Sequence, residues 1–557
     1  MANQHLRYMK IKDGFGKYII AAIIVMAALL RLWKLDSIPP HLTPDEASLG
    51  YNAYSILKTG RDEYGKFMPV IFKSFGDYKP GLYIYTTVPF VAIFGLNEWS
   101  VRLSGAISGI FAVWLVYLIT RKLFGNKIAI FSTFILAISP WHLQFSRGAW
   151  EVNLSLTLTL AGIYFFLKSL HNSLFIIHSS VFFALTAVAY QGAKLSTGIV
   201  VLILLGLYWR DVIKIEAKHL VFGIVVGTVL SLPIFLSFFT GETGRLGIFS
   251  VFSYPRPKEY LQAFLDEGGE KVGDLNYYLF HTESYNFLRG VLGRYFNHFS
   301  GRFLFFEGDW TNPRHSAPNH GVLLLSDIIL LTLGAFALIR YGNKKESLFI
   351  WLWLFLSPLP AVLSRDQIHA VRAMNEVIPL TVILAFGINY LFEKKNKILK
   401  IAFVGGYFIS FIYFLDAYFI HLSTHDSKLW EYGYKQIVET VTPIQYKYKA
   451  VKVQQSFSQP YIYFLFYQKY DPAKYQKQAI LAESEYKGDV GYVTKLENIE
   501  FVPIDWSVNR GERGVLFVAD AIRIPPEDSK DESQFKLLKE IKYLNGRDTA
   551  FRVVEVK

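Results

Sequence analysis

Long apolar stretches recur along the first 420 residues of this 557-residue chain, and they constrain its fold more than any other feature. Each has about 17 to 22 residues, which at about 1.5 Å per residue is enough to cross a hydrocarbon core of roughly 30 Å. Hydrophobic residues make up 52% of the chain and charged residues only 18%, unlike the balance of a soluble globular domain. The sequence therefore predicts a protein that folds within a bilayer.

Twelve apolar segments are candidates for membrane spans, but a crossing by all twelve would place the main basic loops outside, against the positive-inside rule. The second segment is the one that we expect not to cross, because it is short, contains Pro89 and is flanked by Lys79 and Glu98. We expect it to lie along the membrane interface. The segments lie near residues 18–34, 81–96, 102–120, 128–145, 152–167, 174–191, 195–209, 219–239, 321–340, 347–363, 376–392 and 399–420.

Eleven crossings with the N-terminus inside place the basic clusters of the loops on the inner side. The outer side then receives the loop 36–101, the long loop 240–320, the tail that follows residue 420, and the turns 141–151, 190–194 and 364–375. We therefore expect a multi-pass protein of the plasma membrane whose active site and C-terminal region are extracytoplasmic.

The tail differs from the rest of the chain, because it is polar and its apolar runs are short. Helical patterns at residues 429–441 and 461–467 flank a strand-like run at 449–453. The predicted fold class is an α-helical polytopic membrane domain of about 11 transmembrane helices, with interfacial helices in the first outer loop, over residues 1–420. A soluble α/β domain is predicted to follow over residues 421–557.

Composition and motifs exclude several kinds of chemistry. The chain has no cysteine, which rules out disulfides, thiolate catalysis and cysteine-ligated metals. It has no phosphate-binding glycine loop followed by Lys and Ser or Thr, no His-Glu-x-x-His and no Gly-x-Ser-x-Gly. The formal charge of +13 is explained by the inner loops, so we expect no nucleic-acid partner.

The polar residues that suit catalysis fall on the outer side in this topology. Arginine and lysine beside carboxylates are typical of a site that holds an anionic leaving group next to a general base. The candidates are Asp45, Glu46, Asp77, Lys79, His142, Arg147, Glu151, Arg314, His315, His369 and Arg372.

Each of these residues also has a structural interpretation. Asp45 is suited to cap a surface helix, with Glu46 complementing the helix dipole. Lys79 is suited to contact lipid headgroups, and Arg147 and Glu151 to form a pair one helical turn apart. The gathering of so many groups on one side of the membrane favours a single site.

Four motifs resemble those of the GT-C type membrane glycosyltransferases, in particular the superfamily of protein O-mannosyltransferases and aminoarabinose transferases. They are Pro44-Asp45-Glu46, Asp77-Tyr78-Lys79-Pro80, Glu98 with Arg102-Leu103, and Ser146-Arg147 followed by Glu151. The chain departs from the family's Lys-Pro-Pro-Leu with Lys79-Pro80-Gly81-Leu82, and from its late Arg-Tyr pair with Met374-Asn375 after Arg372.

The resemblance implies an inverting transfer of a sugar from a polyprenyl-phosphate carrier to an acceptor hydroxyl, with no metal or other cofactor. It implies that Asp45 is the base and that basic residues hold the lipid phosphate. The partners are then the lipid-linked donor, membrane lipids, and a protein, lipid or glycan acceptor, which the sequence leaves open. The catalytic candidates are Asp45, Glu46, Asp77 and Glu151, and the substrate-binding candidates are Lys79, Arg102, His142, Arg147, Arg314, His315, His369 and Arg372.

The alternatives come from other functional classes. A polytopic transporter of a lipid or polar solute would be equally apolar, but it predicts polar residues at the membrane midplane and internal repeats. A structural scaffold would leave the cost of Arg147 and Glu151 at the end of a span unexplained.

Overall fold

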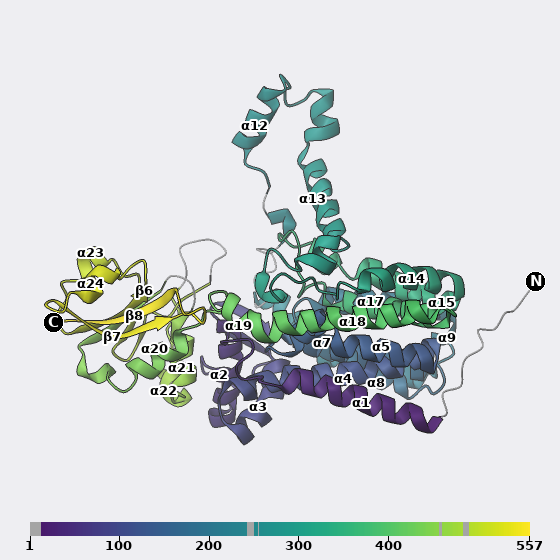
Figure 1. Ribbon diagram of the computed structural model, residues 1–557, viewed down its shortest axis with the longest axis horizontal. Coiled ribbons are helices and arrows are strands. Elements are labelled where there is room, and N and C mark those ends of the chain that lie inside the picture. The colour runs from purple at the N-terminus through teal and green to yellow at the C-terminus, as the bar shows by residue number, and fades with distance from the viewer. Residues whose placement is uncertain (1–12, 242–249, 254, 456–458, 483–489) are drawn as a thin grey trace, which may run out of the picture.

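The computed structural model describes residues 13–241, 250–253, 255–455, 459–482 and 490–557. Most of its helices form an elongated bundle in which α1, α4, α5, α7, α17 and α18 run side by side (Figure 1). The bundle core is one large cluster of buried aliphatic and aromatic side chains. The bundle helices are α1 (Asp13–Leu32), α4 (Glu98–Phe124), α5 (Asn126–Ile138), α6 (Pro140–Ser146), α7 (Glu151–Ser169), α8 (Phe175–Ala189), α9 (Ala193–Val212), α10 (Ala217–Thr240), α14 (Asp327–Tyr341), α15 (Lys344–Leu356), α16 (Leu359–Val362), α17 (Val377–Glu393) and α18 (Lys397–Asp416).

Within the described part of the chain, six helices are long and apolar enough to cross a membrane, or seven if α5 and α6 are one bent span. Two shorter apolar helices, α8 and α3 (Leu82–Phe94), accompany them. The predicted fold class, a helical membrane domain followed by a sheet-containing domain, is confirmed. The count of eleven crossings stays a prediction.

The segment expected as one continuous span at residues 128–145 is divided in the structure. Helices α5 and α6 meet at an angle of 57°. Pro140 is the first residue of α6, where its missing N–H costs nothing, and Ser139 caps the new helix by accepting a hydrogen bond from the His142 N–H. The break turns the polar end of the segment away from the axis of α5.

Close approach of α14 and α17 depends on two glycines. A Cβ atom at Gly334 would overlap the Ile383 carbonyl oxygen, and one at Gly387 would overlap the Leu330 carbonyl oxygen. The two backbones therefore touch where these residues meet, which is how small residues let membrane helices pack.

The first outer loop contains two helices and a hairpin. Helix α2 (Pro44–Thr59) begins at a capping box formed by Thr43 and Glu46. Strands β1 (Ile71–Ser74) and β2 (Asp77–Pro80) then pair antiparallel and lead into α3. The turn residues Phe75 and Gly76 have φ of 55° and 83°, as a two-residue type I′ turn requires. The helix α3 was expected from the sequence, whereas the hairpin was not.

The segment between α10 and α14 carries two helices that project sideways from the bundle (Figure 1). They are α12 (Lys258–Glu267) and α13 (Glu283–Asn297). The remainder consists of short turns, η1 (Val251–Ser253), η2 (Tyr277–His281), η3 (Arg302–Phe306) and η4 (Pro313–His315). Part of the predicted outer loop 240–320, at residues 242–249 and 254, lies outside the described residues.

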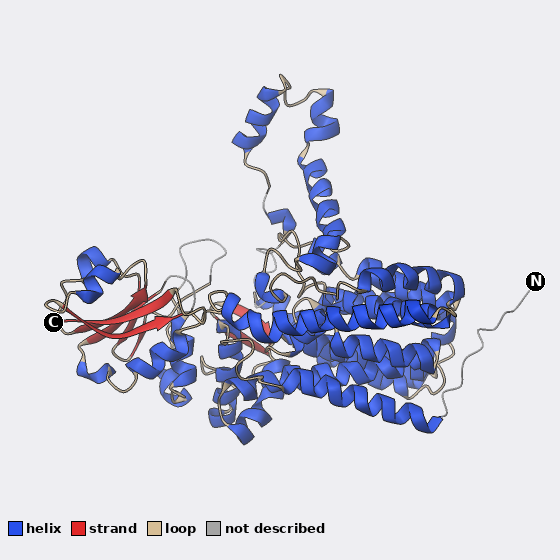
Figure 2. Ribbon diagram, in the orientation of Figure 1, coloured by secondary structure: helices blue, strands red, loops and turns tan. Residues whose placement is uncertain are grey.

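The C-terminal domain is built on a six-stranded mixed sheet of order β4-β5-β3-β6-β8-β7 (Figure 2). Strand β3 pairs parallel with β5 and with β6, and the remaining pairs are antiparallel. The strands are β3 (Ala450–Gln454), β4 (Lys495–Leu496), β5 (Ile499–Val502), β6 (Val515–Asp520), β7 (Phe535–Lys542) and β8 (Thr549–Val556). The short turn η5 (Met374–Glu376) precedes α17 in the bundle. The helices and turns that follow α18 and connect the strands are η6 (Ala417–His421), α19 (Leu422–His425), α20 (Tyr434–Val441), η7 (Gln445–Lys447), α21 (Pro460–Tyr467), α22 (Pro472–Gln478), α23 (Trp506–Asn509) and α24 (Pro526–Lys530).

The two faces of this sheet belong to two different cores. Along β6, Leu516 and Val518 join the cluster that contains α20 and α21, whereas Phe517 and Ala519 join the cluster around Trp506. This alternation is the period of two that a strand with both faces buried imposes.

The C-terminal domain and the first outer loop share one hydrophobic core. Leu49 and Ala53 of α2 pack in the same cluster as Ile462 of α21. Gln476 of α22 donates hydrogen bonds to the Ser55 and Thr59 hydroxyls, both at the C-terminal end of α2. The sheet domain is therefore docked on the loop that carries Asp45.

A buried carboxyl group lies within this shared region. Glu63 is fully buried and accepts a hydrogen bond of 3.1 Å from the Asn52 amide, and the Tyr461 hydroxyl of α21 lies 3.5 Å from its other oxygen. Burial, with a smaller contribution from the charge of Asp62, raises the pKa of Glu63 to about 8. Glu63 is therefore protonated near neutral pH in the folded protein.

We expect the stability of the folded protein to fall as pH rises from about 4.5 to about 8. The folded-state pKa of Glu63 lies above its ordinary value of 4.5, so only the folded chain keeps this proton over that interval. The contribution is complete below pH 4.5 and is lost as pH passes about 8. Melting temperatures across this range should show the decline, and Glu63→Gln should flatten it. An equal slope in Glu63→Gln would contradict the assignment.

Candidate active site

Asp45 and Lys79 form an ion pair at one end of the bundle. Asp45 is in the first turn of α2 and its side chain is 61% exposed, while Lys79 comes from β2 and is 19% exposed. Pro44 and the Thr43 cap start the helix so that Asp45 is one of its first residues, and the I′ hairpin brings Lys79 opposite it. Two residues that are 34 positions apart in the sequence thus share one site.

The charges around this pair hold both groups in their ionised forms. The partial loss of water around Asp45 would by itself raise its pKa, but the charge and hydrogen bond of Lys79 and the charge of Arg314 outweigh this effect and lower the pKa. Burial would lower the pKa of Lys79, but the charges of Asp45, Glu151 and Asp77 raise it. The structure therefore places three further predicted site residues, Arg314, Glu151 and Asp77, within electrostatic range of Asp45 or Lys79.

A second group of side chains borders this cluster on the α8–α9 side. Tyr190 interacts electrostatically with Arg372 and Glu151, and Arg372 pairs with Asp366 at 2.9 Å. Gln191 donates a hydrogen bond of 3.0 Å to the carbonyl of Tyr78, which precedes Lys79. The predicted topology places the polar turn 190–194 on the same side of the membrane as Asp45. This position was the sequence signal for Tyr190 and Gln191, which were not among the predicted site residues.

Glu46 faces the opposite way from Asp45 and is only 2% exposed. Its carboxylate accepts hydrogen bonds from Arg102 at 3.0 and 3.3 Å and from the Ala149 N–H at 2.9 Å. It also accepts from the Thr43 N–H at 3.0 Å, which completes the capping box. The structure thus uses Glu46 and Arg102 to hold the start of α2 against α4.

Two buried arginines hold the loop that leads from α1 to α2. Arg102 donates hydrogen bonds to the carbonyls of Leu35, Pro39 and His41. Arg147 donates to the carbonyls of Leu30, Trp33, Lys34 and Ile38. These include carbonyls that lose their helical partners where α1 ends, so the arginines replace the missing donors.

The structural alternative for Arg147, a pair with Glu151 one helical turn away, is not what the structure contains. Helix α7 begins at Glu151, so Arg147 lies outside it, and the ring of Phe419 packs 4.8 Å from the guanidinium. His142 is also buried away from Asp45, where its Nδ1 accepts a 2.7 Å hydrogen bond from Arg31.

Asp309, His315 and His369 form a buried cluster whose ligand atoms lie within 4.8 Å of one another, as a metal site would need. The Asp309 carboxylate already accepts from His315 at 2.8 Å and from the N–H groups of Ala370 and Asn312. Burial raises the pKa of Asp309, but the hydrogen bond and charge of His315 and the charge of His369 outweigh it and leave the pKa at about 2. Asp309 is thus fully used in orienting its neighbours, and the expectation that no metal is needed stays a prediction.

Part of the sequence matches a family of known proteins. The family model described as dolichyl-phosphate-mannose-protein mannosyltransferase matches residues 79–236. A relative described as "Putative mannosyltransferase YkcB", from Bacillus subtilis (strain 168), is 28% identical over 133 residues. These residues are 23% of this chain and 18% of YkcB. The chain therefore matches less than a fifth of the length of this relative.

The fold is that of ArnT from Cupriavidus metallidurans. The crystal structure of ArnT bound to undecaprenyl phosphate superposes with a TM-score of 0.53 at 14% identity, over 97% of this chain and 98% of ArnT. Its apo structure superposes with a TM-score of 0.52 over the same shares of both chains. The resemblance to GT-C glycosyltransferases is confirmed by the family match within residues 79–236, and the similarity of fold to ArnT extends along almost the whole chain.

We expect Glu46→Gln to destabilise the protein far more than Asp45→Asn does. Glu46→Gln leaves the buried Arg102 without its counter-charge, and breaking a buried pair in this way costs about 3–5 kcal/mol. Asp45 is 61% exposed and Lys79 keeps the nearby charges of Glu151 and Asp77, so loss of this ion pair should cost no more than about 1 kcal/mol. Melting temperatures of the two purified variants would measure the difference, and equal values would show that Glu46 has no such structural role.

Proposed function

We propose that this protein, which has the fold of ArnT, is an inverting glycosyltransferase that uses a polyprenyl-phosphate sugar as donor. The observation that carries the proposal is the Asp45–Lys79 pair, with Arg314 and Glu151 within electrostatic range. A carboxylate that is accessible and ionised is suited to accept a proton, and a lysine beside it is suited to bind phosphate. A transporter needs no such pairing at one end of its bundle.

In the proposed reaction, Asp45 takes the proton of an acceptor hydroxyl while the acceptor oxygen attacks the anomeric carbon. The new bond forms as the bond from that carbon to the phosphate oxygen breaks, and a single displacement of this kind inverts the anomeric centre. The lipid phosphate leaves with the bonding electron pair. Its growing negative charge is stabilised by Lys79, Arg314 and Arg372, so the proposal needs no metal ion.

The ion pair itself suggests how the site changes when donor binds. Lys79 is bound to Asp45 in the structure. A donor phosphate competes for the same ammonium, because it is an anion that a lysine can bind in place of the carboxylate. Binding of donor would then release Asp45 to act as the base.

The proposal extends to the substrates and to the side of the membrane. The family model over residues 79–236 supports a hexose, and mannose first, as the sugar to test. A protein, a lipid and a cell-surface glycan are the acceptors to test. We place the reaction on the extracytoplasmic side of the plasma membrane, because that is where the positive-inside rule locates Asp45 and Lys79.

We expect Asp45→Asn to lower turnover by about 10²- to 10⁴-fold, the usual contribution of a general base. Donor affinity should not fall, because Asp45 acts on the acceptor and its replacement removes the carboxylate that competes with the donor phosphate for Lys79. Mass spectrometry of products, with a separate donor-binding measurement, would test this. Asp36→Asn is the matched control, because Asp36 is an exposed carboxylate in the loop that precedes α2. Near wild-type turnover in Asp45→Asn would remove Asp45 as the base.

We expect Lys79→Gln to move the acidic limb of the kcat/KM profile to higher pH. Loss of the ammonium removes the main interaction that lowers the pKa of Asp45, so the base would be protonated at a pH where the wild-type base is still ionised. Lys73→Gln is the control, since Lys73 is on the same hairpin and lies over the Tyr64 ring. An unshifted limb with reduced kcat/KM would leave Lys79 with phosphate binding alone.

A further inference from the structure

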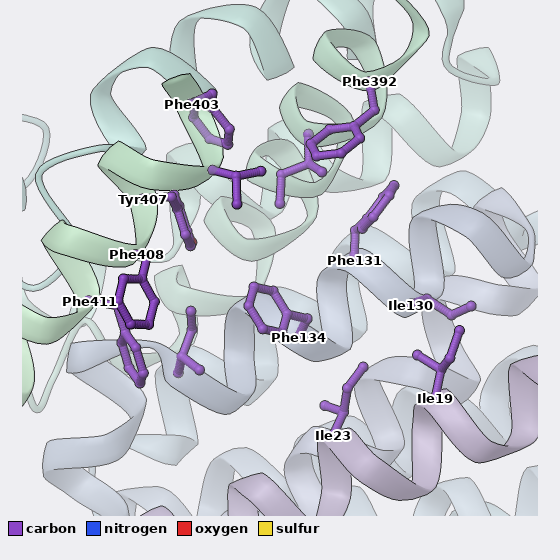
Figure 3. Close-up of a pocket in the computed structure, with 13 residues that line it drawn as sticks. Ile19, Ile23, Ile130, Phe131, Phe134, Phe392, Phe403, Tyr407, Phe408 and Phe411 are labelled. Carbon is purple, nitrogen blue, oxygen red and sulfur yellow. The ribbon is translucent and has the colours of Figure 1, made fainter. Parts of the chain in front are cut away.

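An apolar cavity of about 400 Å³ lies between α1, α5, α17 and α18 (Figure 3). Its walls include Ile23 of α1, Phe134 of α5, Phe392 of α17, and Val404 and Phe408 of α18. In Figure 3 the labelled side chains converge on one space from helices that are far apart in the sequence. The cavity has the size of a site for one small ligand or one lipid chain.

The cavity opens on its α18 side. Ile23 and Ile130 at its base are 7% exposed, whereas Val404 and Phe408 are 52% and 62% exposed. Because α18 is a candidate membrane span, this opening faces hydrocarbon and an acyl chain can enter it.

Positive charge gathers at one end of the cavity. The Lys400 ammonium lies 5.9 Å from the centroid of Phe392, a lining ring. Lys127 precedes the lining residues of α5 and pairs with Glu393 at 3.3 Å, and Lys17 is an exposed residue two positions before the lining Ile19. Exposed Lys394 lies in the turn between α17 and α18, and exposed Lys397 is the first residue of α18. Basic residues beside an apolar space between membrane helices are typical of binding sites for anionic headgroups.

We propose that this cavity binds an anionic phospholipid, with one acyl chain between α18 and the other three helices and its phosphate beside Lys17, Lys127 and Lys400. Helix α1 has 20 residues and thus spans about 30 Å, and Asp45 lies beyond its far end. The phosphate of a polyprenyl donor held at Lys79 is therefore at the opposite end of the bundle. The bound phospholipid fixes α18, whose continuation places Phe419 on Arg147.

The test is lipid retention by the full-length protein, measured by native mass spectrometry after delipidation and titration. Phosphatidylglycerol and phosphatidylcholine with identical acyl chains are compared, and we expect phosphatidylglycerol to bind more tightly. Val404→Trp fills the cavity and should abolish retention of phosphatidylglycerol by the protein. Ile409→Trp is the matched control, because Ile409 is on the same helix and is 69% exposed but does not line the cavity.

A second variant tests the headgroup and does not fill the cavity. Lys400→Gln should weaken binding of phosphatidylglycerol about fivefold, the effect of one lysine near a lipid surface, and leave phosphatidylcholine unchanged. Lys218→Gln, at the start of α10, should change neither.

Three results would overturn the proposal. Equal retention by Val404→Trp and Ile409→Trp would show that the cavity is not the site. Equal binding of the two lipids by wild-type protein would show that the site does not select an anionic headgroup. Displacement of phosphatidylglycerol by polyprenyl phosphate, together with loss of polyprenyl-phosphate binding in Val404→Trp, would identify the carrier as the occupant. All three readouts are independent of sugar transfer, so the proposal does not fail or succeed with the proposed reaction.

Discussion

The buried contact between Arg102 and Glu46 is the interaction on which the candidate site depends. Arg102 is fully buried within α4, where an unpaired charge would be costly. Its guanidinium bonds both to Glu46 and to three carbonyls of the loop that follows α1. One side chain therefore joins α1, α2 and α4, and it places the first turn of α2 where Asp45 meets Lys79.

Two adjacent acids consequently have opposite tasks. Successive residues of a helix point about 100° apart, so when Glu46 is directed inward to Arg102, Asp45 is directed outward. Glu46 has its hydrogen bonds satisfied by the protein, whereas Asp45 is balanced mainly by one lysine that a substrate phosphate can take over. Glu46 supports the start of α2 rigidly, and Asp45 has a partner that a substrate can displace. Together these are what a preorganised general base requires.

The position of Asp45 also depends on the far end of the chain. Helix α2 is packed between the membrane bundle and α21, and a Cβ atom at Gly50 would overlap both Val101 of α4 and Phe466 of α21. The sheet domain is thus part of the support of the site, and α18 connects that domain to the bundle. A lipid that holds α18 in place would act on the same connection.

The sequence by itself determined that this protein folds within a membrane, where most of its helices lie, and that a polar tail of mixed structure follows them. It also identified the two residues that form the ion pair. Apolar length and charge in loops are local properties, so they can be read without coordinates. Only the tertiary structure decided that Glu46 turns inward, that Arg147 binds the end of α1 instead of Glu151, that Lys79 arrives on a hairpin, and that residues 128–145 bend at Pro140. The first three depend on which distant groups lie within hydrogen-bonding distance, and no local pattern of side chains encodes that. The bend follows from Pro140 and the Ser139 cap, but these local residues do not by themselves exclude a continuous span.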